Sequence, residues 1–60
     1  MTEVEIRRIR GELSQSEFAD MLNISVRTLQ DWEQGRHPPS AAATALLNLV
    51  KSGVLKKPKR

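Results

Sequence analysis

The chain has 60 residues, enough for one small domain with a modest hydrophobic core. It contains no cysteine and a single histidine, which excludes disulfide bonds and thiolate metal sites and argues against structural zinc. Its longest apolar run is too short to cross a bilayer, and acidic residues interrupt the basic N-terminal segment, so neither a membrane span nor a signal peptide is expected. The expectation is a soluble cytoplasmic protein without a cofactor.

The charge is unevenly distributed along the chain. Ten Lys and Arg residues against seven Asp and Glu residues give a net charge of +3. Four of the ten lie within residues 56–60, so residues 1–55 carry six basic and seven acidic groups, a net charge of −1. A protein drawn to phosphate by bulk charge would be more basic. If the chain binds a polyanion, its basic groups must gather on one face, and the tail would add attraction without sequence preference.

Helix-starting signals begin at the N-terminus, and strand signals are absent. Thr2-x-x-Glu5 is a capping box that predicts a first helix, with Ile6, Ile9 and Leu13 at helical spacing. Gly11 is expected to end or loosen this helix.

A second capping box, Ser14-x-x-Glu17, predicts a helix over residues 15–22 with an apolar stripe of Phe18, Ala19 and Leu22. Asn23 tolerates the left-handed conformation that a tight turn needs, and Ile24 can fill the corner.

Ser25 can cap a third helix over residues 26 to about 34, with Leu29 and Trp32 facing inward. Gly35 closes it, and residues 36–39 contain two prolines that cannot continue a helix.

Ser40 can cap a fourth helix, rich in Ala and Leu, that continues to about residue 51. We expect residues 1–55 to form the domain and residues 56–60 to form a basic, flexible tail.

Two short amphipathic helices separated by two or three residues have the spacing of a helix-turn-helix. The second helix leaves an exposed polar row of Ser25, Arg27, Thr28 and Gln30. In this motif the first helix crosses the phosphate backbone, while the N-terminal half of the second contacts base edges in the major groove. The pattern therefore predicts binding to duplex DNA.

Two segments carry a family resemblance: Leu13-Ser-Gln-Ser-Glu-Phe-Ala19 and Ser25-Val-Arg-Thr-Leu-Gln-Asp-Trp-Glu-Gln-Gly35. They resemble the Cro/repressor-type (Xre) helix-turn-helix family. The run W-E-Q-G-R, followed by Pro39-Ser40 and an Ala/Leu-rich helix, is most similar to HigA-type antitoxins and small phage-like repressors. The resemblance covers residues 6 to about 50. It implies an all-α, lambda-repressor-like DNA-binding domain: a four- to five-helix bundle with a central helix-turn-helix.

The resemblance implies base contacts from the third helix. Arg27 can bind O6 and N7 of guanine, Gln30 can pair with adenine, and Val26 can meet a thymine methyl group. Asp31 can accept from a cytosine amine. The alternatives are that Arg27 and Gln30 are ordinary solvated residues and that Asp31 pairs with Arg27 four residues earlier.

Phosphate contacts are expected around this helix. Gln15 can reach a phosphate through its amide or through the start of its helix, and Arg36 can reach a neighbouring phosphate. Ser25 and Thr28 can bind a phosphate or a base, although Ser25 can equally serve only as a helix cap. Glu33 is expected to form a structural ion pair with an arginine of the first helix, such as Arg7 or Arg10, while Trp32 belongs to the core.

The fourth helix and the residues after it carry more apolar side chains than one buried stripe needs. The surplus predicts a two-fold dimer that would hold two recognition helices about 34 Å apart. The alternative is that all of them pack inside one subunit. The residues predicted for the dimer interface are Leu46, Leu49, Val50, Val54 and Leu55.

These patterns predict a sequence-specific transcription regulator that binds a palindromic operator. The expected role is an autorepressing antitoxin or a small repressor. The antitoxin role would imply a cognate toxin of the ribonuclease type as a partner. The alternative is a protein-interaction module that neutralises a toxin or docks on another protein, with DNA binding secondary. No nucleophile, base and orienting group converge in the sequence, so no enzyme is expected.

Overall fold

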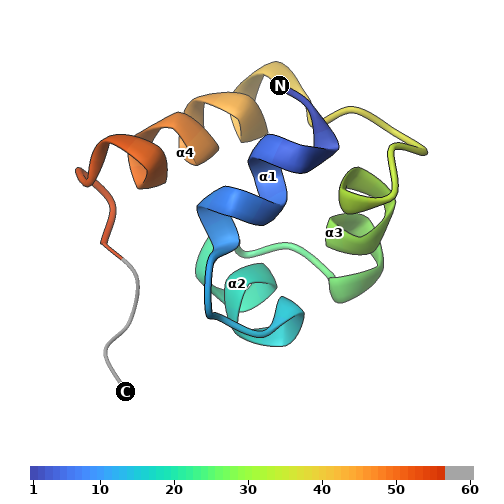
Figure 1. The fold of residues 1–60 in the computed structure, drawn as a ribbon, viewed down its shortest axis with the longest axis horizontal. Coiled ribbons are helices and arrows are strands. Elements are labelled where there is room, and N and C mark those ends of the chain that lie inside the picture. Colours follow the sequence, from blue (N-terminus) through green and yellow to red (C-terminus); the bar gives the residue numbers. More distant parts are fainter. Residues whose placement is uncertain (57–60) are drawn as a thin grey trace.

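The computed structural model describes residues 1–56, and these residues form four α-helices joined by short loops (Figure 1). Within this part of the chain there are no strands, so the all-α prediction is confirmed. The predicted basic tail lies outside the described residues except for Lys56. The helices are α1 (Glu3–Arg10), α2 (Gln15–Leu22), α3 (Val26–Glu33) and α4 (Ala41–Ser52).

Helices α1 and α2 begin at the two capping boxes that the sequence predicts. The Thr2 hydroxyl accepts from the Glu5 backbone N–H at 3.2 Å, and the Glu5 carboxylate accepts from the Thr2 N–H at 3.4 Å. The reciprocal pair at Ser14 and Glu17 has distances of 3.1 and 2.9 Å. Each box satisfies backbone donors that the first turn of a helix leaves unpaired.

The turn between α2 and α3 is built on Asn23, which adopts the left-handed conformation with φ 58° and ψ 44°. Its backbone N–H donates to Asp20 O at 3.1 Å, and the Ile24 N–H donates to Ala19 O at 2.9 Å. These bonds satisfy the last carbonyls of α2 and turn the chain within three residues. Ser25 then caps α3, as predicted.

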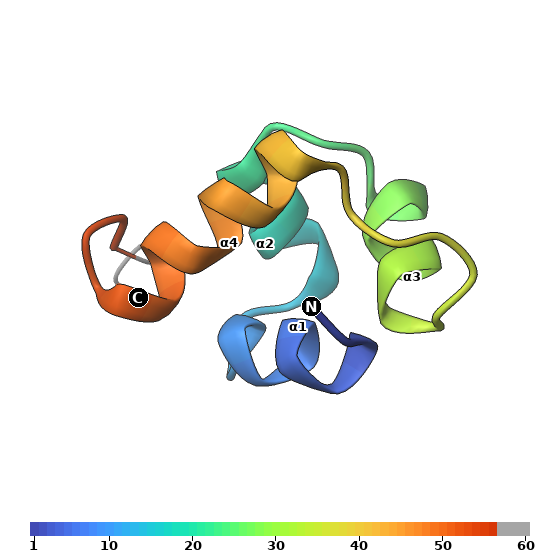
Figure 2. The same cartoon turned by 90° about the horizontal axis from the view of Figure 1, so that it is seen from above.

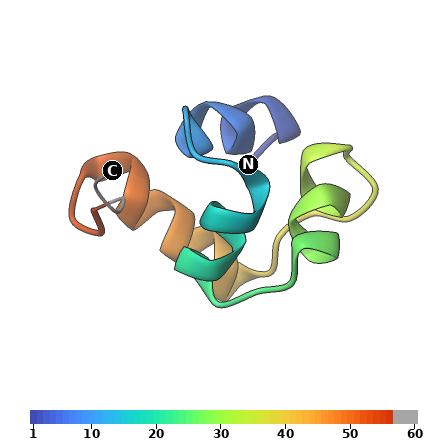
Figure 3. The same ribbon diagram turned by 90° about the horizontal axis from the view of Figure 1, so that it is seen from below.

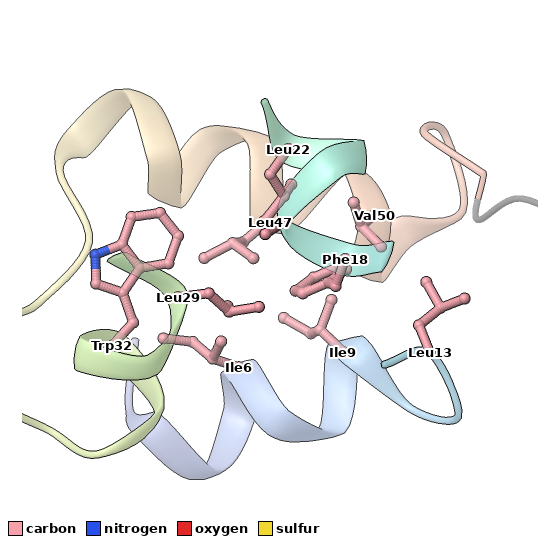
Figure 4. Close-up of a cluster of buried hydrophobic side chains, with 10 residues drawn as sticks. Ile6, Ile9, Leu13, Phe18, Leu22, Leu29, Trp32, Leu47 and Val50 are labelled. Carbon is pink, nitrogen blue, oxygen red and sulfur yellow. The ribbon is translucent and has the colours of Figure 1, made fainter. Parts of the chain in front are cut away.

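One hydrophobic core joins all four helices. Ile6 of α1, Phe18 of α2, Leu29 of α3 and Leu47 of α4 are fully buried and point toward one another (Figure 4). Helix α3 packs against both α1 and α2, and α4 packs against α1. Turned views show α3 at one end of the molecule and the C-terminal end of α4 at the other (Figures 2 and 3).

No helix in residues 1–56 combines the length and the apolar character needed to cross a bilayer.

Candidate nucleic-acid interface

Helix α3 has one buried and one exposed face. Leu29 and Trp32 are 0% and 7% exposed and hold the helix on the core, as predicted. Because side chains three and four positions apart share a face, Arg27 and Asp31 fall on the opposite side. The Arg27 side chain is 75% exposed. A helix of only two turns is thus firmly anchored and presents a cation outward.

Arg27 is paired along the exposed face. Its Nε lies 3.5 Å from Oδ1 of Asp31, and the other carboxylate oxygen of Asp31 lies 3.8 Å from Nδ1 of His37. The structure therefore contains the Arg27–Asp31 pair that the sequence offered as one role for Asp31. An exposed pair of this kind contributes about 0.5 kcal/mol or less, so Arg27 can leave it at little cost.

Ser25 and Thr28 form a local hydrogen-bonded unit at the start of α3. The Ser25 hydroxyl accepts from the Thr28 backbone N–H at 3.1 Å and lies 2.9 Å from the Thr28 hydroxyl. The capping role of Ser25 is confirmed. Ser25 is exposed and Thr28 half-buried, so this end of the helix remains open to a ligand.

A buried ion pair ties α3 to α1. Arg10 donates through Nε to Glu33 Oε2 at 2.8 Å and through Nη2 to Oε1 at 3.1 Å. Its Nη1 donates to the carbonyl of Leu13 at 2.8 Å. Glu33 is only 4% exposed, so this two-pronged pair neutralises a charge that the core would otherwise exclude. The expected bridge from Glu33 to an arginine of the first helix is formed by Arg10.

The Gln15 amide extends this network toward the surface. Its Nε2 donates to Glu33 Oε1 at 3.1 Å, and its Oε1 accepts from Gln30 Nε2 at 3.5 Å. The contact places Gln30 beside the first residue of α2. The amino-acid sequence does not predict that the amide of Gln15 is engaged, because 18 residues separate it from Glu33 and no local spacing signals the contact.

The two remaining residues predicted for DNA contact flank the exposed face of α3. Val26 is half-buried and packs against the edge of the core. Arg36 is exposed just after α3, and its backbone N–H donates to Asp31 O at 2.9 Å, which closes the helix.

The five residues predicted for a dimer interface divide into two groups. Leu46, Leu49 and Val54 are 38%, 41% and 73% exposed. Val50 is buried in the core of the subunit, and the half-buried Leu55 packs against that core. The exposed apolar surface of α4 is therefore narrower than the sequence pattern suggested.

No group of three or more His, Asp or Glu side chains within residues 1–56 is arranged to hold a metal ion.

The Helix-turn-helix family model matches residues 4–49, which contain α2, α3 and the turn between them. The chain belongs to the helix-turn-helix family. Among curated proteins it is similar to the antitoxin HigA-2 of Vibrio cholerae serotype O1, with 48% identity over 48 residues. This match covers 77% of the chain and 46% of the relative, so the chain spans about half the length of that protein. The resemblance that the motifs indicated is thus confirmed.

Proposed function

We propose that the chain is a sequence-specific DNA-binding transcription regulator, not an enzyme, that inserts α3 into the major groove. The observation that carries this proposal is the geometry of Arg27. Its side chain is 75% exposed on the outer face of a helix that Leu29 and Trp32 hold on the core. A protruding helix with an outward arginine at its N-terminal half is the element that helix-turn-helix domains use to read bases.

Each predicted contact has a chemical counterpart on duplex DNA. Arg27 donates two parallel hydrogen bonds to O6 and N7 of guanine, and Gln30 pairs with adenine. Val26 meets a thymine methyl group, and Asp31 either orients Arg27 or accepts from a cytosine amine. Phosphate contacts come from Gln15 at the start of α2 and from Arg36 just after α3, while Ser25 and Thr28 at the start of α3 bind a phosphate or a base.

The regulator acts as a two-fold dimer on a palindromic operator. Leu46, Leu49 and Val54 lie exposed on or just after α4, whose C-terminal end is at the end of the molecule away from α3 (Figure 1). Apolar contact between two copies would leave both α3 helices free, and half-sites about one helical turn apart would receive them. The similarity to an antitoxin supports repression of the chain's own operon, as an antitoxin or a small repressor.

A second candidate function is neutralisation of a toxin of the ribonuclease type. The antitoxin relative supports it, and the exposed leucines of α4 offer an apolar surface. The two functions can coexist. Arg27→Ala distinguishes them: it should relax base selection at one position of the operator and leave toxin binding unchanged.

The test begins with selection of preferred duplexes from a random library by the wild-type protein. Affinity for the selected operator and for unrelated DNA is then measured at one fixed salt concentration, because phosphate contacts make all affinities depend on salt. Arg27→Ala should lose about 1–3 kcal/mol of discrimination at one base pair. Lys51→Ala is the matched control: it removes the same charge from the exposed surface of α4 and should leave discrimination unchanged.

Two outcomes would contradict the proposal in different ways. If Arg27→Ala weakens binding equally to operator and unrelated DNA, Arg27 contacts only phosphate. If selection yields no preferred sequence, sequence-specific regulation is wrong.

A further inference from the structure

A chain of side-chain contacts runs from the interior to the proposed DNA surface and crosses three helices. It begins with the ion pair of Arg10 and Glu33, passes through the Gln15 amide and ends at the Gln30 amide. The successive distances after the ion pair are 3.1 Å and 3.5 Å. Glu33 is the buried member, at 4% exposure, while Gln15 and Gln30 are half-buried.

Hydrogen-bond chemistry allows only one donor-to-acceptor order along this series of side-chain contacts. A carboxylate paired with a guanidinium can only accept, so Gln15 must turn its NH₂ group toward Glu33. The carbonyl oxygen of Gln15 then faces Gln30, which must in turn present its own NH₂ group. Rotation of either amide by half a turn would bring two oxygens or two NH₂ groups together. The Glu33 carboxylate therefore sets, through Gln15, the orientation of the Gln30 amide.

We propose that Glu33 is a positioning residue for base recognition, which acts through Gln15 to hold the Gln30 amide in one orientation at the DNA surface. This inference rests on the proposed function. In that orientation Gln30 keeps its carbonyl oxygen and one N–H free, the acceptor and donor that match N6 and N7 of adenine. An amide free to rotate can instead offer only its NH₂ group to guanine or only its oxygen to cytosine. Holding the amide therefore disfavours the wrong bases.

Three variants test this relay, by which we mean the contacts from Glu33 through Gln15 to Gln30. Gln30→Ala identifies the base pair that Gln30 reads. Glu33→Gln preserves the shape of the side chain but lets its amide face Gln15 with either group, so the direction is lost. Gln15→Leu breaks the link and leaves the Arg10–Glu33 pair intact. It therefore separates positioning from stability, and it keeps the test valid if Glu33→Gln unfolds.

The measured quantity is the preference for adenine over other bases at the position that Gln30→Ala identifies. Glu33→Gln and Gln15→Leu should each reduce this preference roughly tenfold. The guanine preference at the Arg27 position should stay unchanged in both variants. A purely structural defect would lower affinity for every sequence and alter no single preference. Asn48→Ala, which removes an exposed amide from α4, should change neither preference.

The relay is wrong if both variants retain the adenine preference that Gln30→Ala abolishes; the proposed function would then stand. It is also wrong if Gln30→Ala changes no base preference. A wild-type protein that selects no sequence would overturn the proposed function and the relay together.

Discussion

Glu33 is a carboxylate that the fold buries almost completely in a domain with little stability to spare. Its charge is tolerated because Arg10 meets both oxygens and Gln15 adds a third donor. A buried pair of this kind adds little net stability over apolar residues, but the loss of one member leaves an uncompensated charge. At the residue scale, Arg10 and Glu33 act as a unit.

Arg10→Ala should therefore lower the free energy of unfolding by about 3 kcal/mol, a large part of what a domain of this size has. Replacing both members, with Arg10→Met and Glu33→Leu, should cost much less, because no charge is left unpaired. Urea denaturation followed by circular dichroism measures both. Equal losses in the single and the double variant would contradict this reading of the pair.

The amino-acid sequence predicted some of these side-chain contacts and not others. The family resemblance predicted that Glu33 pairs with an arginine of the first helix, and Arg10 is that arginine. The sequence did not predict the engagement of Gln15, because contacts between residues far apart in sequence depend on how helices are placed. The base contacts of Arg27 and Gln30 remain predictions.

The helix-turn-helix element depends on backbone conformation as much as on packing. Asn23 sits in the left-handed region, which most side chains avoid, and its N–H and that of Ile24 close the end of α2. Any residue that resists this conformation would strain the angle between α2 and α3. The residue at position 23 therefore influences the direction in which α3 protrudes from the domain.

Asn23→Ala should reduce stability by about 1 kcal/mol, since alanine pays the steric cost of a positive φ. For a domain of this size, this loss corresponds to a fall in melting temperature of roughly 4–8 °C. Asn23→Gly is the matched control and should melt at or above the wild-type temperature. An unchanged melting temperature for Asn23→Ala would show that the turn imposes no such demand. Thermal denaturation measures all three proteins.

Helix boundaries were largely predictable because caps and turns are local. Thr2, Ser14, Ser25 and Ser40 each act within one turn, and each begins a helix as expected. The inward face of α4 was not predictable in the same way. Apolar residues cover much of that helix, and only packing shows that Leu47 and Val50 are buried while Leu46 and Leu49 are exposed.

Helix α3 and the C-terminal end of α4 lie at opposite ends of the molecule (Figures 1 and 2). Arg27 is exposed on α3, and exposed apolar residues lie on and just after α4. This arrangement would let two copies associate while both recognition helices remain free. A palindromic site would then gain affinity from two linked contacts.

Leu49→Glu should disrupt the proposed dimer, because it places a charge in an apolar contact. Sedimentation equilibrium should give a mass near that of one 6.8 kDa chain, and affinity for the full operator should fall toward that for a single half-site. Asn48→Glu adds the same charge at the neighbouring exposed position and should disturb association less. If Leu49→Glu leaves the mass and the affinity of the wild type unchanged, this surface is not the dimer interface.

Methylation interference on the selected operator tests most directly whether α3 reads the major groove through Arg27. Guanine N7 lies in the major groove, so a methyl group there should block wild-type binding at one guanine in each half-site. The Arg27→Ala variant should still bind the operator, with lower affinity, and its binding should no longer be blocked by methylation of this guanine. Interference confined to adenine N3, in the minor groove, or a pattern that Arg27→Ala leaves unchanged, would contradict the proposal.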